Sequence, residues 1–292
     1  MARSVAKTRA DALEAAPAPM AMSPEHDRAP QELVAGDPGA ETGATSAQAP
    51  QARHARICVV VPAFNEARSI ARVVERLHLS LPDAHVVVVN DGSEDDTARR
   101  ALRAGATVIT LPVNLGIGGA VQVGYRYALR NGFDIAIQVD GDDQHDPSEI
   151  ERLLAPIREG RAEMTVGSRW LGRGDYVATT GRRFAMRFLA RLVSWRTGAT
   201  FTDTTSGFRA VGVEGIALFA RSYPTDFPEV ESLVLASRNG LRLEEVPVRM
   251  SPRGHGQSSI TGFRSAYYMA RVTVALVVGS LNEQRPTEKE AP

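Results

Sequence analysis

A short acidic segment in the middle of the chain is the part of the sequence best suited to chemistry. Asp140, Asp142 and Gln144 alternate there, so in an extended chain their side chains point to the same side. Two carboxylates and an amide oxygen suit a hard cation such as Mg²⁺ or Mn²⁺, which takes waters and substrate phosphate oxygens at its other positions. The alternative is that the acids only cap the next helix, a role that suits Asp146 before a proline. We predict a metal site at Asp140, Asp142 and Gln144, and leave a direct role for His145 open.

Two further polar loops could contact a ligand. Asp91 lies directly after an apolar segment, where its carboxylate could accept hydrogen bonds from a base or a ribose, although it could also belong to an ordinary turn. A glycine-rich loop at 116–119 opens a predicted helix, whose free N–H groups can bind an anion. Val121 occupies the third glycine position of the dinucleotide fingerprint G-x-G-x-x-G. The loop is therefore weak evidence for a dinucleotide site.

Apolar segments of strand length precede these loops. They lie at 57–61, 86–89, 107–110, 135–139 and 164–166, and stretches with the 3.6-residue apolar period of a helix follow the first four. Strands that alternate with helices are typical of a mostly parallel sheet covered by helices on both faces. Such sheets bind ligands beyond the carboxyl ends of their strands. We therefore expect an α/β fold in which the polar loops gather at one edge of the sheet.

The composition is uneven along the 292 residues. Residues 1–55 are rich in alanine and proline and contain neither an aromatic residue nor an isoleucine, so we expect a disordered tail. The formal net charge is zero, which gives no support for nucleic-acid binding. The single cysteine, Cys58, cannot form an internal disulfide and is expected in the core. Acidic residues interrupt the first twenty positions, so we do not expect a secretory signal.

Six motifs, taken in order, carry a family resemblance. They are VPAFNE at 61–66, NDGS at 90–93, NLGIG at 114–118, DGDDQH at 140–145, GSR at 167–169 and TSGFR at 205–209. Together they resemble family 2 glycosyltransferases of the GT-A fold, and among these the dolichyl- or polyprenyl-phosphate sugar synthases. The resemblance covers about residues 56–262. It implies a single Rossmann-like GT-A domain, a GDP- or UDP-sugar donor, a divalent metal and inversion at the anomeric carbon.

The resemblance also implies roles for individual residues. The donor would contact Pro62, Phe64, Asn65, Glu66, Asp91, Gly92, Asn114, Gly118, Asp140 and Gly141. Asp140, Asp142 and Gln144 would hold the metal and the donor diphosphate, and Asp142 would be catalytic. Arg169 after the fifth strand would also be catalytic, and Arg253 would lie in a flexible loop that closes over the donor phosphates.

One residue departs from the pattern of those synthases. Asp143 stands where they usually carry an apolar residue. We expect it either to change the affinity for the metal or to face solvent.

A predicted amphipathic helix carries the catalytic candidates Arg183 and Arg187. Its apolar face consists of Phe184, Phe188, Leu192 and Trp195. The arginines could bind a lipid phosphate while the hydrocarbon follows the apolar face, or they could belong to an ordinary surface helix. A lipid phosphate is mostly anionic near neutral pH and needs no base, whereas a hydroxyl acceptor needs a carboxylate such as Glu231 or Glu229. Either glutamate could instead pair with arginines.

Residues 263–282 contain the last predicted helix. Its apolar run at 266–278 is interrupted by Arg271 and falls short of the ~20 residues that cross a bilayer. We expect an amphipathic helix on a membrane surface or on a small membrane-protein partner, with docking on the protein's own core or in a homo-oligomer as the alternative. Residues 283–292 would form a polar tail.

Three functions follow from these observations. The first is a peripheral enzyme of the cell envelope, on the cytoplasmic face of the membrane, that transfers a sugar from a nucleotide to polyprenyl phosphate. The second is a transferase that acts on a hydroxyl group of a polysaccharide or glycan. The third is a non-catalytic nucleotide-sugar-binding subunit of a membrane complex, against which the intact set Asp140, Asp142, Gln144 and Arg169 argues.

Overall fold

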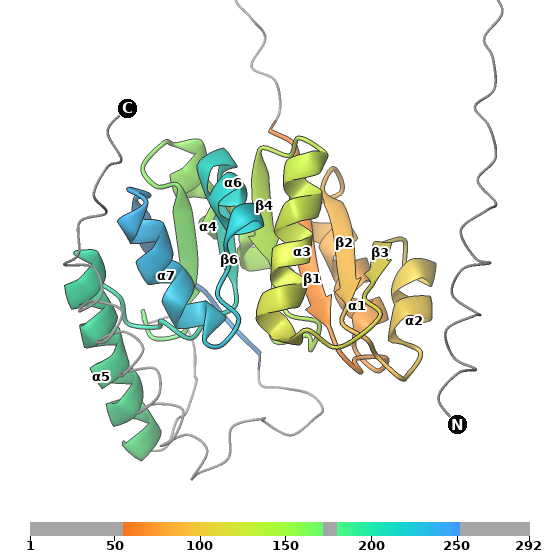
Figure 1. Ribbon diagram of the computed structural model, residues 1–292, viewed down its shortest axis with the longest axis horizontal. Coiled ribbons are helices and arrows are strands. Elements are labelled where there is room, and N and C mark those ends of the chain that lie inside the picture. Colours follow the sequence, from red (N-terminus) through yellow and green to blue (C-terminus); the bar gives the residue numbers. More distant parts are fainter. Residues whose placement is uncertain (1–54, 172–179, 252–292) are drawn as a thin grey trace, which may run out of the picture. The chain divides into compact units, whose positions relative to one another are not determined.

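A mixed β-sheet forms the centre of the structure (Figure 1). The computed structural model describes residues 55–171 and 180–251. Most of the predicted tail, Arg253 and the predicted helix at 263–282 lie outside the described residues. Within these residues the sheet has seven strands in the order β3-β2-β1-β4-β6-β5-β7. Their bounds are β1 Ile57–Ala63, β2 His85–Asn90, β3 Thr107–Thr110, β4 Ile135–Gln138, β5 Met164–Ser168, β6 Arg209–Val211 and β7 Leu243–Pro247.

Six of these strands run in the same direction. Strand β1 pairs in parallel with β2 and β4, β2 with β3, and β5 with β7, whereas β6 is antiparallel to both β4 and β5. The carboxyl ends of the parallel strands therefore meet at one edge of the sheet, which we call the carboxyl edge. The predicted mostly parallel α/β sheet is confirmed, with β6 as its antiparallel member.

Both faces of the sheet are buried, which explains the unbroken apolar strands. In β1, Cys58 and Val60 belong to one core cluster, while Val59 and Val61 belong to the other. All four side chains are fully buried. The predicted core position of Cys58 is thus confirmed, and burial raises the pKa of its thiol to about 12.

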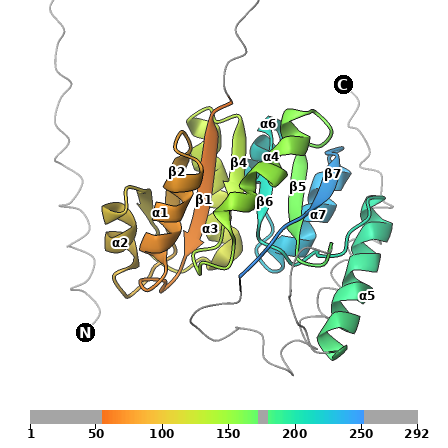
Figure 2. The same ribbon diagram turned by 180° about the vertical axis from the view of Figure 1, so that it is seen from behind.

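Helices cover the two faces. The first core cluster includes residues of α3 (Gly116–Arg130), α5 (Thr180–Thr197), α6 (Val213–Arg221) and α7 (Pro228–Arg238), which lie on the near side in Figure 1. The second includes residues of α1 (Ile70–Ser80), α2 (Thr97–Arg103) and α4 (Ile150–Arg158), on the near side in Figure 2. A short 3₁₀ helix, η1 (Pro147–Glu149), leads into α4. None of the helices in the described ranges combines the length and the hydropathy that a membrane crossing demands.

Candidate active site at the carboxyl edge

The loops after β1 and β2 are joined to each other at the carboxyl edge. The main-chain N–H of Asn65 donates to Ser93 Oγ at 2.9 Å, and Asn65 Oδ1 accepts from the N–H of Glu94 at 3.0 Å. The N–H of Glu66 donates to Thr97 Oγ1 at 2.8 Å. Asn65 has a positive φ of 56°, a conformation that asparagine tolerates better than most residues. This arrangement fixes the main chain directly after Phe64, whose side chain is exposed.

Asp91 connects the second loop to the third. Its buried carboxylate accepts a hydrogen bond from the N–H of Leu115 through Oδ1 at 2.7 Å. Gly92 has a φ of 70°, and a Cβ on it would lie 2.9 Å from the main-chain nitrogen of Asn114. A side chain at residue 92 is therefore excluded by the close approach of the two loops. The structure brings Asp91, Gly92 and Asn114 together and gives each of them a role in loop geometry. Their predicted contact with the donor stays a prediction.

Gly118 has a packing role. A Cβ on it would lie 2.3 Å from the carbonyl oxygen of Pro224, so glycine lets the start of α3 approach that segment. This contact alone explains the glycine, and the predicted contact between Gly118 and the donor stays a prediction.

The acidic loop after β4 lies against the loop after β1. A Cβ on Gly141 would be 3.2 Å from the carbonyl oxygen of Pro62 and 3.6 Å from Cγ of Glu66. The predicted donor residues Pro62, Glu66 and Gly141 therefore lie side by side, and their contact with a donor stays a prediction. Gly207, from the loop before β6, packs against the carboxylate of Asp140.

His145 contacts both the main chain and the carboxylate of Asp140. Its Nδ1 accepts a hydrogen bond from the N–H of Asp140 at 3.1 Å, so the ring proton of the neutral imidazole is on Nε2, which lies 3.5 Å from Asp140 Oδ2. The ring is buried and stacks on Phe208 with a centroid distance of 4.7 Å. His145 therefore orients the main chain and the carboxylate of Asp140.

The acidic residues suit a divalent cation that is bound partly by the protein and partly by the phosphates of a substrate. Oδ1 of Asp140 is buried and has no hydrogen-bond partner among the described residues, which is the state expected of a carboxylate oxygen kept for a cation or a donor group. Asp142 is also buried, and its Oδ1 accepts from the N–H of Gln144 at 3.1 Å. No cluster of three or more His, Cys, Asp or Glu side chains suited to a metal occurs in the part of the chain that the structure describes. Two carboxylates completed by substrate phosphates and waters are, however, the usual arrangement for Mg²⁺.

Arg169 is held by an aspartate that the sequence analysis missed. Asp203 is fully buried and accepts from Nε of Arg169 at 2.6 Å and from Nη2 at 2.7 Å, while Thr205 Oγ1 accepts from Nη2 at 2.9 Å. Glu245 in β7 in turn accepts from the N–H groups of Thr202 and Asp203. Burial raises the pKa of Glu245. The catalytic role of Arg169 stays a prediction, and the structure identifies Asp203 as the residue that orients its guanidinium.

A buried arginine lies beside the acidic loop. Arg209 in β6 is fully buried, and it donates to Ser232 Oγ at 2.5 Å and to the main-chain carbonyl of Glu229. Burial raises the pKa of Glu229; the charge of Arg209 opposes this rise and that of Asp140 adds to it. Glu229 is therefore close enough to Asp140 for their charges to interact. Glu231 lies in the first turn of α7 and is partly buried.

Helix α5 presents a mixed basic and aromatic surface. Leu189 and Val193 pack into the core, whereas Phe188 and Trp195 are 49% and 73% exposed. Arg187 and Arg191 are exposed on the same helix. The predicted helix is confirmed; the side chains of Arg183 and Phe184 lie outside the described residues. In Figure 1, α5 extends beyond the edge of the sheet at which β1 ends.

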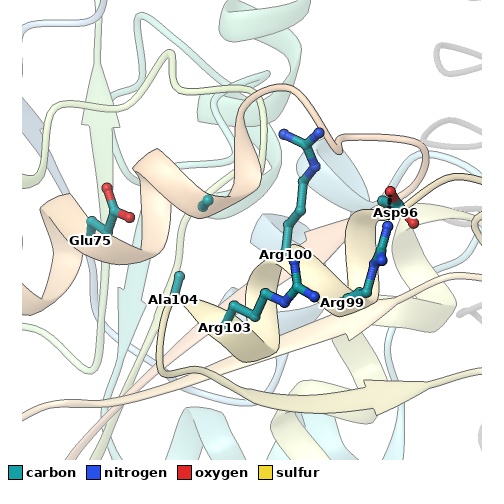
Figure 3. A pocket seen from close by; sticks show the side chains of 7 residues that line it. Glu75, Asp96, Arg99, Arg100, Arg103 and Ala104 are labelled. Atoms are coloured by element: carbon teal, nitrogen blue, oxygen red, sulfur yellow. Dashed lines mark hydrogen bonds and ion pairs between the residues drawn. The ribbon is translucent and has the colours of Figure 1, made fainter.

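A pocket of about 280 Å³ lies between α1 and α2 (Figure 3). Arg99, Arg100 and Arg103 line much of it together with Glu75 and Asp96, and Arg99 is paired with Asp96. It contains none of the predicted site residues and is separate from the carboxyl-edge site.

Comparison with solved structures shows the same fold. Glucosyl-3-phosphoglycerate synthase from Mycobacterium tuberculosis, in complex with Mn²⁺, UDP and glucosyl-3-phosphoglycerate, superposes with a TM-score of 0.58. The match covers 80% of this chain and 82% of that chain, at 22% sequence identity. At this identity the likeness shows the fold alone, which is GT-A, as the sequence predicts.

Sequence comparison shows the family. An uncharacterized protein of Methanocaldococcus jannaschii is 33% identical over 71% of this chain and 88% of its own length. Polyprenol monophosphomannose synthase of Mycolicibacterium smegmatis is 29% identical over 79% and 90%, and undecaprenyl-phosphate mannosyltransferase of Micrococcus luteus is 28% identical over 71% and 88%. The predicted resemblance to polyprenyl-phosphate sugar synthases is thus confirmed. The family model described as glycosyl transferase family 2 matches residues 58–215, more than half of the chain, and the protein belongs to that family.

Proposed function

We propose that this glycosyltransferase moves a sugar from a GDP- or UDP-sugar to polyprenyl phosphate, with inversion at the anomeric carbon. The two named relatives support the acceptor class, because their names refer to polyprenol and undecaprenyl phosphate. The donor would bind at the carboxyl edge, between the loop containing Phe64 and the loop containing Asp140. The domain spans about residues 56–262 in this proposal.

The exposed surface of α5 is the observation that carries the acceptor assignment. Arg187 and Arg191 offer charged donors that suit a phosphate, and the exposed rings of Phe188 and Trp195 offer an apolar surface next to them. Aromatic residues and arginines are characteristic of helices that lie at a membrane interface. The enzyme would therefore act as a peripheral protein on the cytoplasmic face of the membrane.

Positioning is the main task of the site when the acceptor is a phosphate. The acceptor oxygen is already largely anionic near neutral pH, so the arginines of α5 need only hold it in line with the anomeric carbon. Asp140, Asp142 and Gln144 would hold Mg²⁺ or Mn²⁺. When bound, the cation offsets the negative charge that builds up on the departing nucleoside diphosphate. Asp91 would contact the nucleoside through Oδ2, and Phe64 would pack on it.

A hydroxyl acceptor is the second candidate, and the environment of Glu229 favours it. Burial and the nearby Asp140 raise the pKa of Glu229, and a carboxylate with a raised pKa is suited to act as a general base near neutral pH. Glu231, two residues further on, is the other candidate. The two reactions differ in which side chains they need.

Initial rates against polyprenyl phosphate, with the donor saturating, distinguish the two acceptors. A charge-assisted hydrogen bond contributes about 1.5–3 kcal/mol, so Arg183→Ala and Arg187→Ala should each weaken acceptor binding by roughly 10- to 100-fold. Glu231→Gln and Glu229→Gln should have smaller effects. Arg130→Ala, at the exposed end of α3, is the matched control and should behave as the wild type. Normal acceptor dependence in both arginine variants, together with an inactive glutamate variant, would support the hydroxyl reaction instead.

A further inference from the structure

Asp143 is bound by two arginines of α1. Its Oδ2 accepts from Nε of Arg72 at 2.7 Å, and its Oδ1 accepts from Nη1 of Arg76 at 2.7 Å. The other terminal nitrogen of Arg76, Nη2, donates to Asp146 Oδ1 at 3.1 Å. We call these four residues the α1 clamp. The expectation that Asp143 faces solvent is wrong, because its side chain is only 16% exposed and both carboxylate oxygens are bonded.

The clamp holds an unfavourable backbone conformation. Asp143 has a φ of 66°, in the left-handed region that is unfavourable for L-residues, although less so for aspartate than for most of them. This conformation turns the side chain of Asp143 toward α1 and lies between two predicted metal ligands, Asp142 and Gln144. An arginine that bridges two carboxylates in partly buried surroundings holds them more firmly than an exposed ion pair does.

The position of α1 connects the clamp to the donor site. Arg72 and Arg76 are four residues apart and therefore lie on one side of the helix. The helix begins at Ile70, directly after the loop that carries Phe64, Asn65 and Glu66. One helix is thus continuous with the proposed donor loop and bonded to the acidic loop.

We propose that the α1 clamp positions the acidic loop for divalent-cation binding, so that Arg72 and Arg76 are positioning residues although they carry the same charge sign as the cation. The inference rests on the proposed function, because it takes Asp140 and Asp142 as the residues that hold the metal. It adds a role for Asp143, which is a positioning residue and not a ligand.

Electrostatics and positioning predict opposite effects of removing an arginine. If the clamp acted only through charge, Arg76→Ala would remove a positive charge near the cation and strengthen cation binding. If the clamp holds the loop, the same substitution removes one of the two bonds to Asp143 and the bond to Asp146, and it weakens cation binding. Loss of a residue that orients metal ligands typically lowers metal affinity by roughly 10- to 100-fold.

The test is the affinity of the full chain for Mn²⁺ alone, measured by electron paramagnetic resonance of the free ion. Arg72→Ala, Arg76→Ala and Asp143→Ala should each raise the Kd by roughly tenfold or more. The double variant Arg72→Ala/Asp143→Ala should bind Mn²⁺ no more weakly than Asp143→Ala alone, because the bond that Arg72 makes within the clamp goes to Asp143 and is already lost in that single variant. Arg72→Lys keeps the charge and a donor and should retain most of the affinity.

The control is Arg158→Ala, which breaks an exposed pair with Glu151 in α4 and should leave both the Kd and the melting temperature unchanged. Tighter or unchanged Mn²⁺ binding in the Arg72 and Arg76 variants overturns the clamp. Asp142→Asn separates this failure from that of the proposed metal site. If the wild type binds no Mn²⁺, or if Asp142→Asn binds it normally, the proposed metal site is refuted, and the proposed role of the α1 clamp is refuted with it. Arg72 is more than half exposed, so its variants should fold even if Arg76→Ala does not.

Discussion

Replacing Gly207 by alanine tests whether the position of the Asp140 carboxylate matters for catalysis. A Cβ at residue 207 would lie 2.8 Å from Asp140 Oδ1, 2.9 Å from Oδ2 and 3.2 Å from Cγ. Ordinary contacts between such atoms begin near roughly 3.5 Å, so the carboxylate must retreat by roughly 0.7 Å. The backbone of Gly207 is in a region that alanine can adopt, so the strain falls on the side chain of Asp140.

The expected loss follows from this displacement. A 1 Å misplacement in an active site can cost roughly 100-fold in rate, so we expect Gly207→Ala to lower kcat/KM by roughly 10- to 100-fold, or about 1.4–2.7 kcal/mol. The melting temperature should fall by only a few degrees, because an aspartate side chain can move more easily than backbone. The assay is the initial rate of sugar transfer against donor concentration, with melting followed by circular dichroism.

Gly212→Ala is the matched control, since a Cβ there has its nearest neighbour at 3.7 Å. Normal kcat/KM in Gly207→Ala would refute the reasoning. An equal loss in the control would refute it as well, because the effect would then not depend on Asp140.

Three other expectations concern the metal, the N-terminal segment and the cysteine. Asp142→Asn should fold normally but lose metal-dependent turnover, because an amide lacks the charge of the carboxylate; wild-type turnover, or turnover of the wild type in excess chelator, would contradict the metal assignment. Deletion of residues 1–50 should change neither the melting temperature nor turnover with a soluble acceptor analogue, and a drop of several degrees would show that the segment docks on the domain. Burial raises the pKa of Cys58 to about 12, so at pH 8 only about 1 in 10⁴ thiols is ionised. A thiol reagent should therefore label the protein only after unfolding, and rapid labelling of the native protein would contradict the burial.

The first five strands could be predicted because their signal is local. Each apolar run that the sequence shows is a strand, and runs such as 57–61 are buried on both faces, although β3 at the end of the sheet is only partly buried. The parallel strand β7 is not predicted, because two glutamates interrupt its apolar pattern. Strand β6 could not be predicted in this way. It is three residues long and begins with Arg209, which is fully buried. Hydrogen bonds to main-chain carbonyls allow this charged side chain to be buried. A search for apolar runs therefore does not find the strand.

The candidate site, too, has residues that the local sequence predicts and residues that it does not. The residues that follow strands, such as Asp91 and Asp140, could be placed at the carboxyl edge from topology alone. The partners that orient them could not, because Asp203 and Arg169 are 34 residues apart, and Arg72 and Asp143 are 71 residues apart. Residues so far apart in the sequence leave no local pattern that predicts their contact. The unusual aspartate at 143 was the only sequence signal of the α1 clamp, and only the contacts show that its side chain binds Arg72 and Arg76.

The most direct test of the proposed function is the chemical structure of the product formed from a radiolabelled nucleotide sugar, polyprenyl phosphate, Mg²⁺ and the full chain. We predict that the label enters the organic phase in a lipid with a single phosphate joined to the anomeric carbon, with the configuration inverted, and that one nucleoside diphosphate is released for each sugar transferred. Label in a lipid with two phosphates, or label that leaves the nucleotide only for a hydroxyl acceptor, would contradict sugar transfer to polyprenyl phosphate.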